Sequence, residues 1–334
     1  MELEILKAAA LLRQGKVVAI PTETVYGLAA NAFDENAVSQ IFEIKQRPRF
    51  NPLIIHIKSI DDLQKVATNI PEKAMILARH FWPGALTLVL PKKKIVPNIV
   101  TAGKNTVGVR VPSHPVALKL LQQLDFPLAA PSANPFGYIS PTCVAHVQNQ
   151  LGDKIPFILE GGNCEKGIES TIIGFENNEP VLYRVGVISK EEIEKIIGKI
   201  NQKTKAAQAP PAPGMLTKHY SPKTKLKIST NISADIEKYK NQAVGFLVFS
   251  NINYEKSQKI IQLTKTENLN EAAQKLYAAM HQLDAAGFEL ILAEKFPEKG
   301  IGISLNDRLY RAQEENFEPE IQNETKKLAQ QKPL

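Results

Sequence analysis

The chain of 334 residues is 43% hydrophobic and 22% charged, the balance of a globular protein with about two domains. Its 41 Lys and Arg against 34 Asp and Glu give a net charge of +7, which suits an anionic ligand such as a nucleotide or RNA but is too small for a dedicated nucleic-acid tail. The two cysteines exclude a disulfide framework, and no Cys/His spacing predicts a zinc site or any other protein-held metal.

The N-terminus and the apolar runs predict a cytoplasmic protein with no membrane span. The opening residues, MELEILKAAALL, lack the basic start and the cleavage site of a signal peptide, so we expect a first helix there. The longest apolar run, Ala243 to Phe249, is far shorter than the roughly 18 residues that a membrane span needs.

Hydrophobic periodicity predicts an α/β fold for the first half of the chain, with many strands in one mixed sheet. The expected helices span residues 3–14, 35–45, 60–81 and 116–124. The expected strands span residues 16–20, 53–57, 85–90, 107–111, 127–130, 155–160 and 170–175.

Residues 199–222 differ in composition from the chain on either side and predict a linker. Three prolines within four positions (Pro210, Pro211 and Pro213) stiffen it, as in an extended tether. The pattern is compatible with an inert spacer or with a lid that folds over a ligand pocket. We therefore expect a first domain at 1–198, a linker or lid at 199–222 and a second domain at 223–334.

The second domain is predicted to be a smaller, open α/β sheet. Its expected strands span residues 226–228, 244–249 and 290–293. Its expected helices span residues 234–239 and 270–286. The tail from residue 316 onward is mostly polar, and we expect it to fray.

Polar residues gather at predicted strand ends in the first half, although the P-loop and the G-x-G-x-x-G signature are both absent. The segment PTETVYGL (21–28) places two threonines after a strand, where they act as turn caps or as ligand contacts. The segment KQRPRFNPL (45–53) holds three cations between prolines, which is typical of an anion-binding loop or of a solvated basic turn. His56 follows in an apolar strand and lies in the core or in a pocket.

Arg110, within the strand VGVRV, needs a carboxylate or phosphate partner, because an unpaired buried charge is very costly. An internal acidic side chain meets that need as well as a ligand does. The segments APSANPFGYISPT (130–142), EGGNCEKGIESTI (160–172) and VLYRVG (181–186) add hydroxyls, an amide and a further arginine. Together these strand ends predict one concave, basic and hydroxyl-rich site.

Seven segments, in this order, resemble the motifs of YrdC-like domains: PTETVYGL, KQRPRFNPLIIHI, FWPGALTLVL, VGVRVPSHP, APSANPFGYISPT, EGGNCEKGIESTI and VLYRVG. The segment PGMLTKHYSP (213–222) and the α/β domain after it resemble the long, two-domain form of the threonylcarbamoyl-AMP synthase family. The resemblance implies a twisted mixed sheet with a concave basic pocket, followed by a smaller Rossmann-like α/β domain.

The resemblance also implies a nucleotidyltransferase activity. The enzyme would join L-threonine, bicarbonate and ATP into L-threonylcarbamoyl-AMP and release pyrophosphate. This is the first step in the threonylcarbamoyl-adenosine modification of tRNAs that read ANN codons. The expected partner is the downstream tRNA threonylcarbamoyl transferase complex, with at most a weak contact to tRNA itself.

The site residues that the resemblance implies fall into three groups. The threonine pocket would use Thr24, His56, Arg110, Ala130 and Ser170. The ATP side would use Arg47, Asn51, Thr106, Ser132, Ser140, Arg184 and Tyr220. Catalysis by electrostatics and positioning would fall to Lys45, Arg47, Ser132 and Asn134, and no general base is assigned.

The chemistry of these side chains agrees with that assignment. The planar Arg110 guanidinium can hold a carboxylate through two hydrogen bonds, which a lysine cannot do. Lys45, Arg47 and Arg184 offset the charge of a triphosphate and of its pyrophosphate leaving group. We expect Mg²⁺ to be held chiefly by phosphates and water, which requires few protein ligands.

Two other functions fit parts of the pattern. A basic concave surface also suits an RNA-binding module that reads duplex shape, although tight proline-framed loops favour a small pocket. A carbamoyl-transfer enzyme of hydrogenase maturation uses a similar domain, but its zinc-finger cysteines and acylphosphatase region have no counterpart here.

Overall fold

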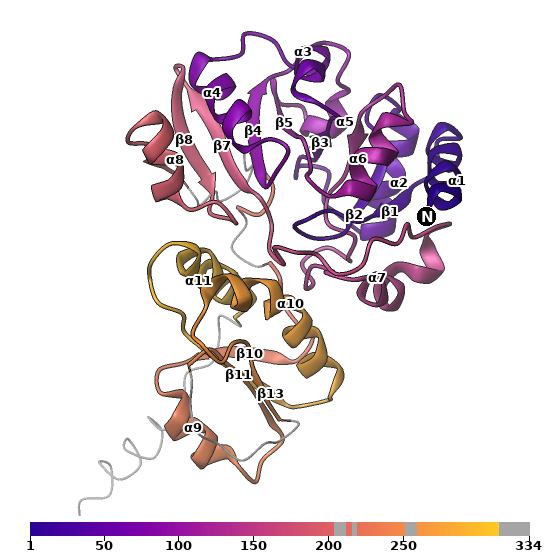
Figure 1. The fold of residues 1–334 in the computed structure, drawn as a ribbon. Helices are drawn as coiled ribbons and strands as arrows, with labels where there is room; N and C mark the ends of the chain where they lie inside the picture. The colour runs from indigo at the N-terminus through magenta and orange to yellow at the C-terminus, as the bar shows by residue number, and fades with distance from the viewer. Residues whose placement is uncertain (204–211, 216–218, 251–258, 314–334) are drawn as a thin grey trace, which may run out of the picture.

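The computed structural model describes residues 1–203, 212–215, 219–250 and 259–313 (Figure 1). The tail that we expect to fray from residue 316, and linker residues 204–211 and 216–218, lie outside this set. Two sheets are visible in Figure 1, a large one with helices around it and a smaller one joined to it through the linker.

In the described part of the chain, nine strands form one mixed sheet in the order β1-β2-β6-β3-β5-β4-β7-β8-β9. They are β1 (Val18–Ile20), β2 (Gly27–Asn31), β3 (Ile54–His56), β4 (Leu86–Pro91), β5 (Thr106–Arg110), β6 (Leu128–Ala129), β7 (Thr171–Glu176), β8 (Glu179–Arg184) and β9 (Asn201–Gln202). The pairs β3/β5, β4/β7 and β8/β9 are parallel, and the other neighbours are antiparallel. The predicted mixed sheet is confirmed.

Helices pack around this sheet and bury their apolar faces on it. They are α1 (Glu2–Arg13), α2 (Glu35–Lys45), α3 (Leu63–Val66), α4 (Glu72–Phe81), α5 (Asn98–Thr101), α6 (Pro115–Gln122), α7 (Val144–Leu151) and α8 (Lys190–Ile197). Helix α2 begins at Asp34, whose carboxylate accepts hydrogen bonds from the amides of Asn36 and Ala37. The helix is followed by its C-cap, Gln46, whose left-handed φ of 52° turns the chain into the loop that carries Arg47 toward β3.

The second domain is built on a four-stranded parallel sheet, which confirms the predicted smaller α/β domain and adds strand β12 (Ile260–Gln262) to the three expected strands. Its strands, in the order β10-β13-β11-β12, are β10 (Lys225–Ser229), β13 (Leu290–Glu294), β11 (Val244–Val248) and β12 (Ile260–Gln262). Its helices are α9 (Ile232–Tyr239), α10 (Leu269–Ala285) and α11 (Ile301–Ala312). Helices α10 and α11 lie on the side of the small sheet that faces the large domain (Figure 1).

One apolar core crosses from one domain into the other. Val25, Ile139 and Ile168 of the large domain share a buried cluster with Leu276 and Tyr277 of α10. This packing joins the α10–α11 layer to the strand ends of the large sheet. Strand β9 extends that sheet to residue 202, and the domain boundaries at 198 and 222 stay predictions.

Two sequence predictions are wrong in the first half. The helix expected at 60–81 is a 3-10 turn (Ile60–Asp62), α3 and α4, because Asn69 adopts a positive φ and Pro71 begins a new helix. The strand expected at 155–160 makes only a single bridge, from Ile158 to Ala19, within the described ladder. Pro156 has no amide hydrogen to donate there, which limits ladder formation.

Candidate active site

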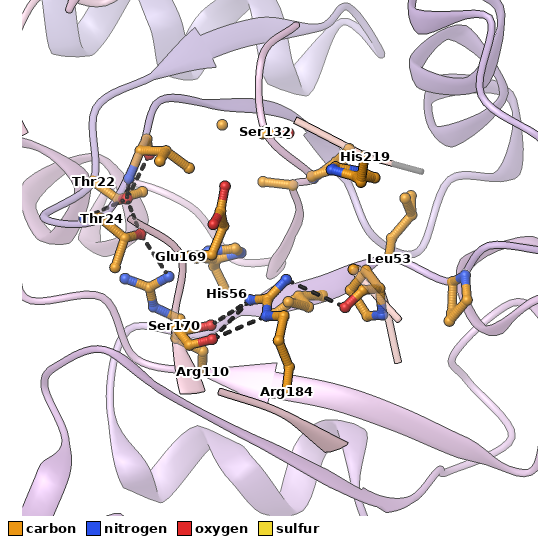
Figure 2. A pocket seen from close by; sticks show the side chains of 18 of the residues that line it. Thr22, Thr24, Leu53, His56, Arg110, Ser132, Glu169, Ser170, Arg184 and His219 are labelled. Carbon is orange, nitrogen blue, oxygen red and sulfur yellow. Dashed lines mark hydrogen bonds between the residues drawn. The ribbon is translucent and has the colours of Figure 1, made fainter. Parts of the chain in front are cut away.

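A pocket lies at the strand ends of the first domain, and its empty space is about 590 Å³, part of it open to solvent (Figure 2). That volume is in the range of ordinary small-molecule sites. All the predicted threonine-site residues line it, namely Thr24, His56, Arg110, Ala130 and Ser170. Four residues of the predicted ATP set also line it, namely Arg47, Ser132, Arg184 and Tyr220.

Five predicted site residues lie outside the lining: Lys45, Asn51, Thr106, Asn134 and Ser140. Thr106 begins β5 and Arg110 ends it, so the strand carries them to opposite ends, about 13 Å apart at 3.3 Å per residue. The side chain of Asn51 is fully buried and has no hydrogen-bond partner among the described residues. Their predicted roles remain predictions, and the structure does not bring these five into contact with the cavity.

Lys45 lies outside the pocket lining and holds one of the pocket loops in place. Its ammonium group donates to the carbonyl oxygen of Ser132 at 2.6 Å and to that of Asn134, and it is 1% exposed. Burial, followed by the nearby Arg47 charge, holds the pKa of Lys45 well below its usual value. Lys45 therefore holds the loop that presents Ser132.

The Arg110 guanidinium lines the pocket. The sequence left open whether its partner is an internal carboxylate or a ligand, and the structure shows an internal one. Arg110 forms a buried ion pair with Glu23 at 2.5 Å, and its other terminal nitrogen donates to Thr24 Oγ1 at 3.0 Å. The carboxylate of Glu23 also accepts from the Ser113 amide. The internal-ion-pair alternative is thus correct, and it leaves Arg110 positioned beside Thr24 in the pocket. Glu23, inside the motif PTETVYGL, is a site residue that sequence reasoning missed.

Two further arginines, Arg47 and Arg184, line the same cavity. Arg47 donates to the carbonyl oxygens of Asn51 and Pro52 at 3.1 and 2.8 Å, which holds it against its own loop. Burial, and then the neighbouring Arg184, lower the pKa of Arg47 to about 9, so it remains charged at neutral pH. Arg184 donates to Ser170 through three hydrogen bonds of 2.9–3.1 Å.

The linker reaches the pocket through residues that the structure describes. Pro213 and Gly214 line the cavity, and the Pro213 carbonyl accepts from Arg184 at 3.3 Å. His219 and Tyr220 also line it, and both are buried, with His219 Nδ1 and Tyr220 Oη lacking partners among the described residues. His219 lies in the segment PGMLTKHYSP but is not among the predicted site residues, so it is an addition to the site.

His56 is a buried, uncharged imidazole on the pocket floor. Burial, followed by the adjacent Arg110 charge, lowers its pKa to about 3. The unfolded chain takes up a proton on this residue near pH 6.5, whereas the folded chain does not until about pH 3. The stabilising contribution is therefore present above pH 6.5 and is lost as the pH falls through this window.

We expect the unfolding free energy of the protein to fall by about 1.4 kcal/mol per pH unit below pH 6.5 because of His56 alone. Urea unfolding at about pH 7 and about pH 5.5 measures the slope. His56→Gln removes this contribution, whereas the matched variant of the exposed His80 leaves the slope unchanged. Equal slopes for His56→Gln and the wild-type protein would rule out the neutral buried imidazole.

The described residues contain no group of three or more His, Cys, Asp or Glu that could hold a metal ion. Within the same residues, no helix combines the length and the apolarity needed to cross a bilayer.

Two family models account for most of the chain. The model described as telomere recombination, of the Sua5, YciO and YrdC proteins, matches residues 10–186. The model described as threonylcarbamoyl-AMP synthase, C-terminal domain, matches residues 188–313. A threonylcarbamoyl-AMP synthase of Pyrococcus abyssi is 44% identical over 91% of this chain and 92% of the relative.

The chain belongs to the threonylcarbamoyl-AMP synthase family. It has the two-domain form of that family, since the second model covers the linker and the C-terminal domain. A threonylcarbamoyl-AMP synthase of Bacillus subtilis is 42% identical over 92% of each chain. The crystal structure of P. abyssi Sua5 complexed with L-threonine superposes with a TM-score of 0.88 at 43% identity, covering 93% of this chain and 94% of the other. The predicted family and fold class are confirmed.

Proposed function

We propose that this chain is a threonylcarbamoyl-AMP synthase, which joins L-threonine, bicarbonate and ATP into L-threonylcarbamoyl-AMP and pyrophosphate. The observation that carries the proposal is one pocket lined both by Arg110, Thr24 and Ser170 and by the cations Arg47 and Arg184. Such a pocket suits an amino acid on one side and a triphosphate on the other. A two-domain relative that was solved with L-threonine supports the same substrate here.

The threonine half of the site recognises a carboxylate, an amine and a hydroxyl. Arg110 supplies the cation for the carboxylate, and Glu23 and Thr24 hold its guanidinium in a fixed plane. Neutral His56 and the hydroxyl of Ser170 offer hydrogen bonds to the other polar groups. Because these donors are buried and already oriented, binding loses little of the freedom that flexible side chains would lose.

The nucleotide half stabilises phosphate charge. Arg47 and Arg184 approach the cavity from two sides, and Ser132 lines it on the loop that Lys45 holds. Pre-oriented cations in a buried site stabilise the charge that develops on pyrophosphate as it leaves. Mg²⁺ bound to the phosphates would add positive charge there, and the described residues offer no protein cage for it.

The reaction needs two bond-forming steps. The uncharged amine of threonine attacks bicarbonate, forms an N–C bond and releases water, which gives the carbamate. A carbamate oxygen then attacks the α-phosphorus, and the bond from that phosphorus to pyrophosphate breaks. The protein contributes proximity and electrostatics, and none of the described side chains is assigned as a general base. Glu169 lines the pocket, but both of its carboxylate oxygens already accept hydrogen bonds from other residues.

The product is a mixed anhydride and must be consumed by an acyl-transfer reaction. We propose that a separate cytoplasmic transferase complex uses it to modify tRNAs that read ANN codons. The enzyme's own contact with tRNA would be weak, since its polar groups converge on a small pocket rather than along a groove.

Incubation of the full chain with ATP, bicarbonate and labelled threonine tests the proposal directly. We expect a threonine-labelled adenylate, detected by mass spectrometry, with pyrophosphate in equal amount. Omission of bicarbonate should stop both products. RNA affinity that falls steeply with salt, together with no adenylate, would instead support an RNA-binding module.

Arg47→Ala and Ser132→Ala are each expected to slow pyrophosphate release at saturating substrates by about 10- to 1000-fold, because each removes a group that faces the developing phosphate charge. Arg49→Ala is the matched control, since Arg49 lies two residues from Arg47 and is exposed. Circular dichroism and thermal unfolding verify the fold of each variant. Release at the wild-type rate in either pocket variant would remove that residue from the nucleotide half.

A further inference from the structure

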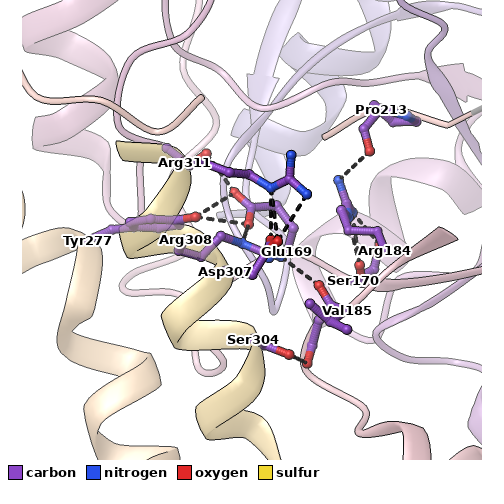
Figure 3. Close-up of polar contacts among 12 residues, drawn as sticks. Glu169, Ser170, Arg184, Val185, Pro213, Tyr277, Ser304, Asp307, Arg308 and Arg311 are labelled. Carbon is purple, nitrogen blue, oxygen red and sulfur yellow. Dashed lines mark hydrogen bonds and ion pairs between the residues drawn. The ribbon is translucent and has the colours of Figure 1, made fainter. Parts of the chain in front are cut away.

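Arg308 of α11 is a fully buried cation that does not line the pocket (Figure 3). Its Nε donates to Glu169 Oε2 at 2.9 Å and its Nη2 to the Val185 carbonyl at 3.0 Å. Its remaining terminal nitrogen pairs with Asp307 at 2.8 Å. The guanidinium carbon also lies 5.0 Å from the ring centroid of Tyr220. Arg308, a side chain of the second domain, thus contacts two segments of the first domain and the linker. We call these two segments, which carry Glu169 with Ser170 and Arg184 with Val185, the pocket arms.

Each of these contacts is next to a residue of the pocket. Glu169 lines the cavity and precedes Ser170, whose carbonyl and hydroxyl hold Arg184. Val185 follows Arg184 directly. Tyr220 lines the cavity from the linker. Arg308 therefore reaches Ser170 through Glu169 and Arg184 through Val185, and it contacts the linker directly at Tyr220.

Other contacts of α10 and α11 hold the same two arms. The Tyr277 hydroxyl donates to Glu169 Oε2 at 3.0 Å, and the Ser304 hydroxyl donates to the Gly186 carbonyl at 2.8 Å. The backbone at Gly167 lies so close to α10 that a Cβ there would overlap the carbonyl oxygen of Ala273. The arms that carry Ser170 and Arg184 thus rest on the second domain.

The contacts of Glu169 favour a role in positioning, because both of its carboxylate oxygens already accept hydrogen bonds from other residues. Burial raises the pKa of Glu169, but the charges of Arg308 and Arg184 and the hydrogen bond from the Ser140 hydroxyl outweigh this effect. The pKa of Glu169 is therefore below its usual value, and the carboxylate is ionised. A buried ion pair contributes little net stability compared with apolar residues of similar volume, although loss of one partner alone is strongly destabilising. What the pair does provide is a fixed geometry for the backbone on either side of it.

We propose that Arg308 is a positioning residue for the synthase reaction. It fixes the 169–170 wall of the pocket and the ring of Tyr220, so that the second domain completes the threonine site. This inference rests on the proposed function, because its readout is threonine use.

The test compares three variants of the full chain with a matched control. Arg308→Met removes the cation. Arg308→Lys keeps the charge but loses the three-way fork. The double variant Glu169→Gln/Arg308→Met removes both charges, so that no unpaired carboxylate is left buried to destabilise the fold. Lys275→Met is the control, because Lys275 forms an exposed ion pair with Glu271 on the outer side of α10.

We expect the threonine KM to rise by about tenfold or more in Arg308→Met, Arg308→Lys and the double variant, as for the loss of one charge-assisted contact. Thermal unfolding should show a large loss of stability for Arg308→Met and a partial recovery in the double variant. Partial unfolding lowers the apparent kcat and leaves KM unchanged, so a raised KM reports positioning.

The outcomes separate the inference from the function on which it rests. No adenylate from the wild-type chain refutes the proposed function. Wild-type turnover, together with an unchanged threonine KM in Arg308→Lys and in the folded double variant, overturns the positioning role and leaves the pair as a structural contact. An equal rise in KM for Lys275→Met would overturn it as well.

Discussion

Arg110→Lys is expected to raise the threonine KM by roughly 10- to 100-fold, with little change in the ATP KM, because one charge-assisted pair contributes about 1–3 kcal/mol. The lysine keeps the charge but has no planar fork. It cannot contact Glu23, Thr24 and a ligand carboxylate in the geometry that Arg110 adopts. The loss therefore falls on the substrate that carries the carboxylate.

Threonine and ATP titrations of initial pyrophosphate release decide this prediction. Arg79→Lys is the matched control, since Arg79 is an exposed arginine on α4, away from the pocket lining. Thermal unfolding establishes that the buried pair with Glu23 has not collapsed. A threonine KM within twofold of the wild-type value would place the carboxylate elsewhere in the pocket.

Gly214→Ala is expected to lower kcat/KM for ATP by about 10- to 100-fold, which corresponds to about 1.4–2.8 kcal/mol. Gly214 has a φ of +79°, which L side chains rarely adopt. A Cβ there would lie 2.8 Å from Arg184 Cδ and 2.9 Å from Tyr220 Oη, so both must move. The substitution displaces a pocket cation and the linker ring together.

Gly287→Ala separates backbone strain from this displacement. Gly287 has a φ of +73°, yet a Cβ there meets no atom within 4 Å. Both variants should lose a similar amount of stability from the positive φ, and only Gly214→Ala should lose activity. Equal activities in the two variants would show that the linker does not need to fit closely against Arg184.

Local patterns were sufficient to predict the fold class and the segments that form the pocket. Alternating apolar residues predicted β5, and a charged residue within that apolar strand singled out Arg110. The motifs KQRPRFNPL and VLYRVG likewise predicted that Arg47 and Arg184 belong to one site. Arg47 follows a helix and Arg184 ends a strand, and the structure places both in the pocket lining. Such features depend on neighbours a few residues away, which a sequence displays directly.

Partners that are distant in sequence could not be predicted in the same way. Glu169 and Arg308 are brought together across 139 positions, and neither has a neighbour that signals the other. Strand β2 was missed because its sequence, GLAAN, has no β-branched or aromatic residue. Its small side chains instead allow close strand packing, because a Cβ added at Gly27 would lie only 3.3 Å from the Cβ of Ala130.

Because α11 contacts the pocket arms, the order of synthesis on the ribosome matters for this protein. Thr24, Arg110 and Arg184 all leave the exit tunnel well before Arg308 does. Until then, the carboxylate of Glu169 has no guanidinium partner, and the apolar patch of Val25, Ile139 and Ile168 is uncovered. A prematurely terminated chain therefore carries the first-domain residues that line the pocket and still lacks the contact that Arg308 makes with Glu169. Such fragments expose apolar surface, which makes them targets for chaperones and proteases.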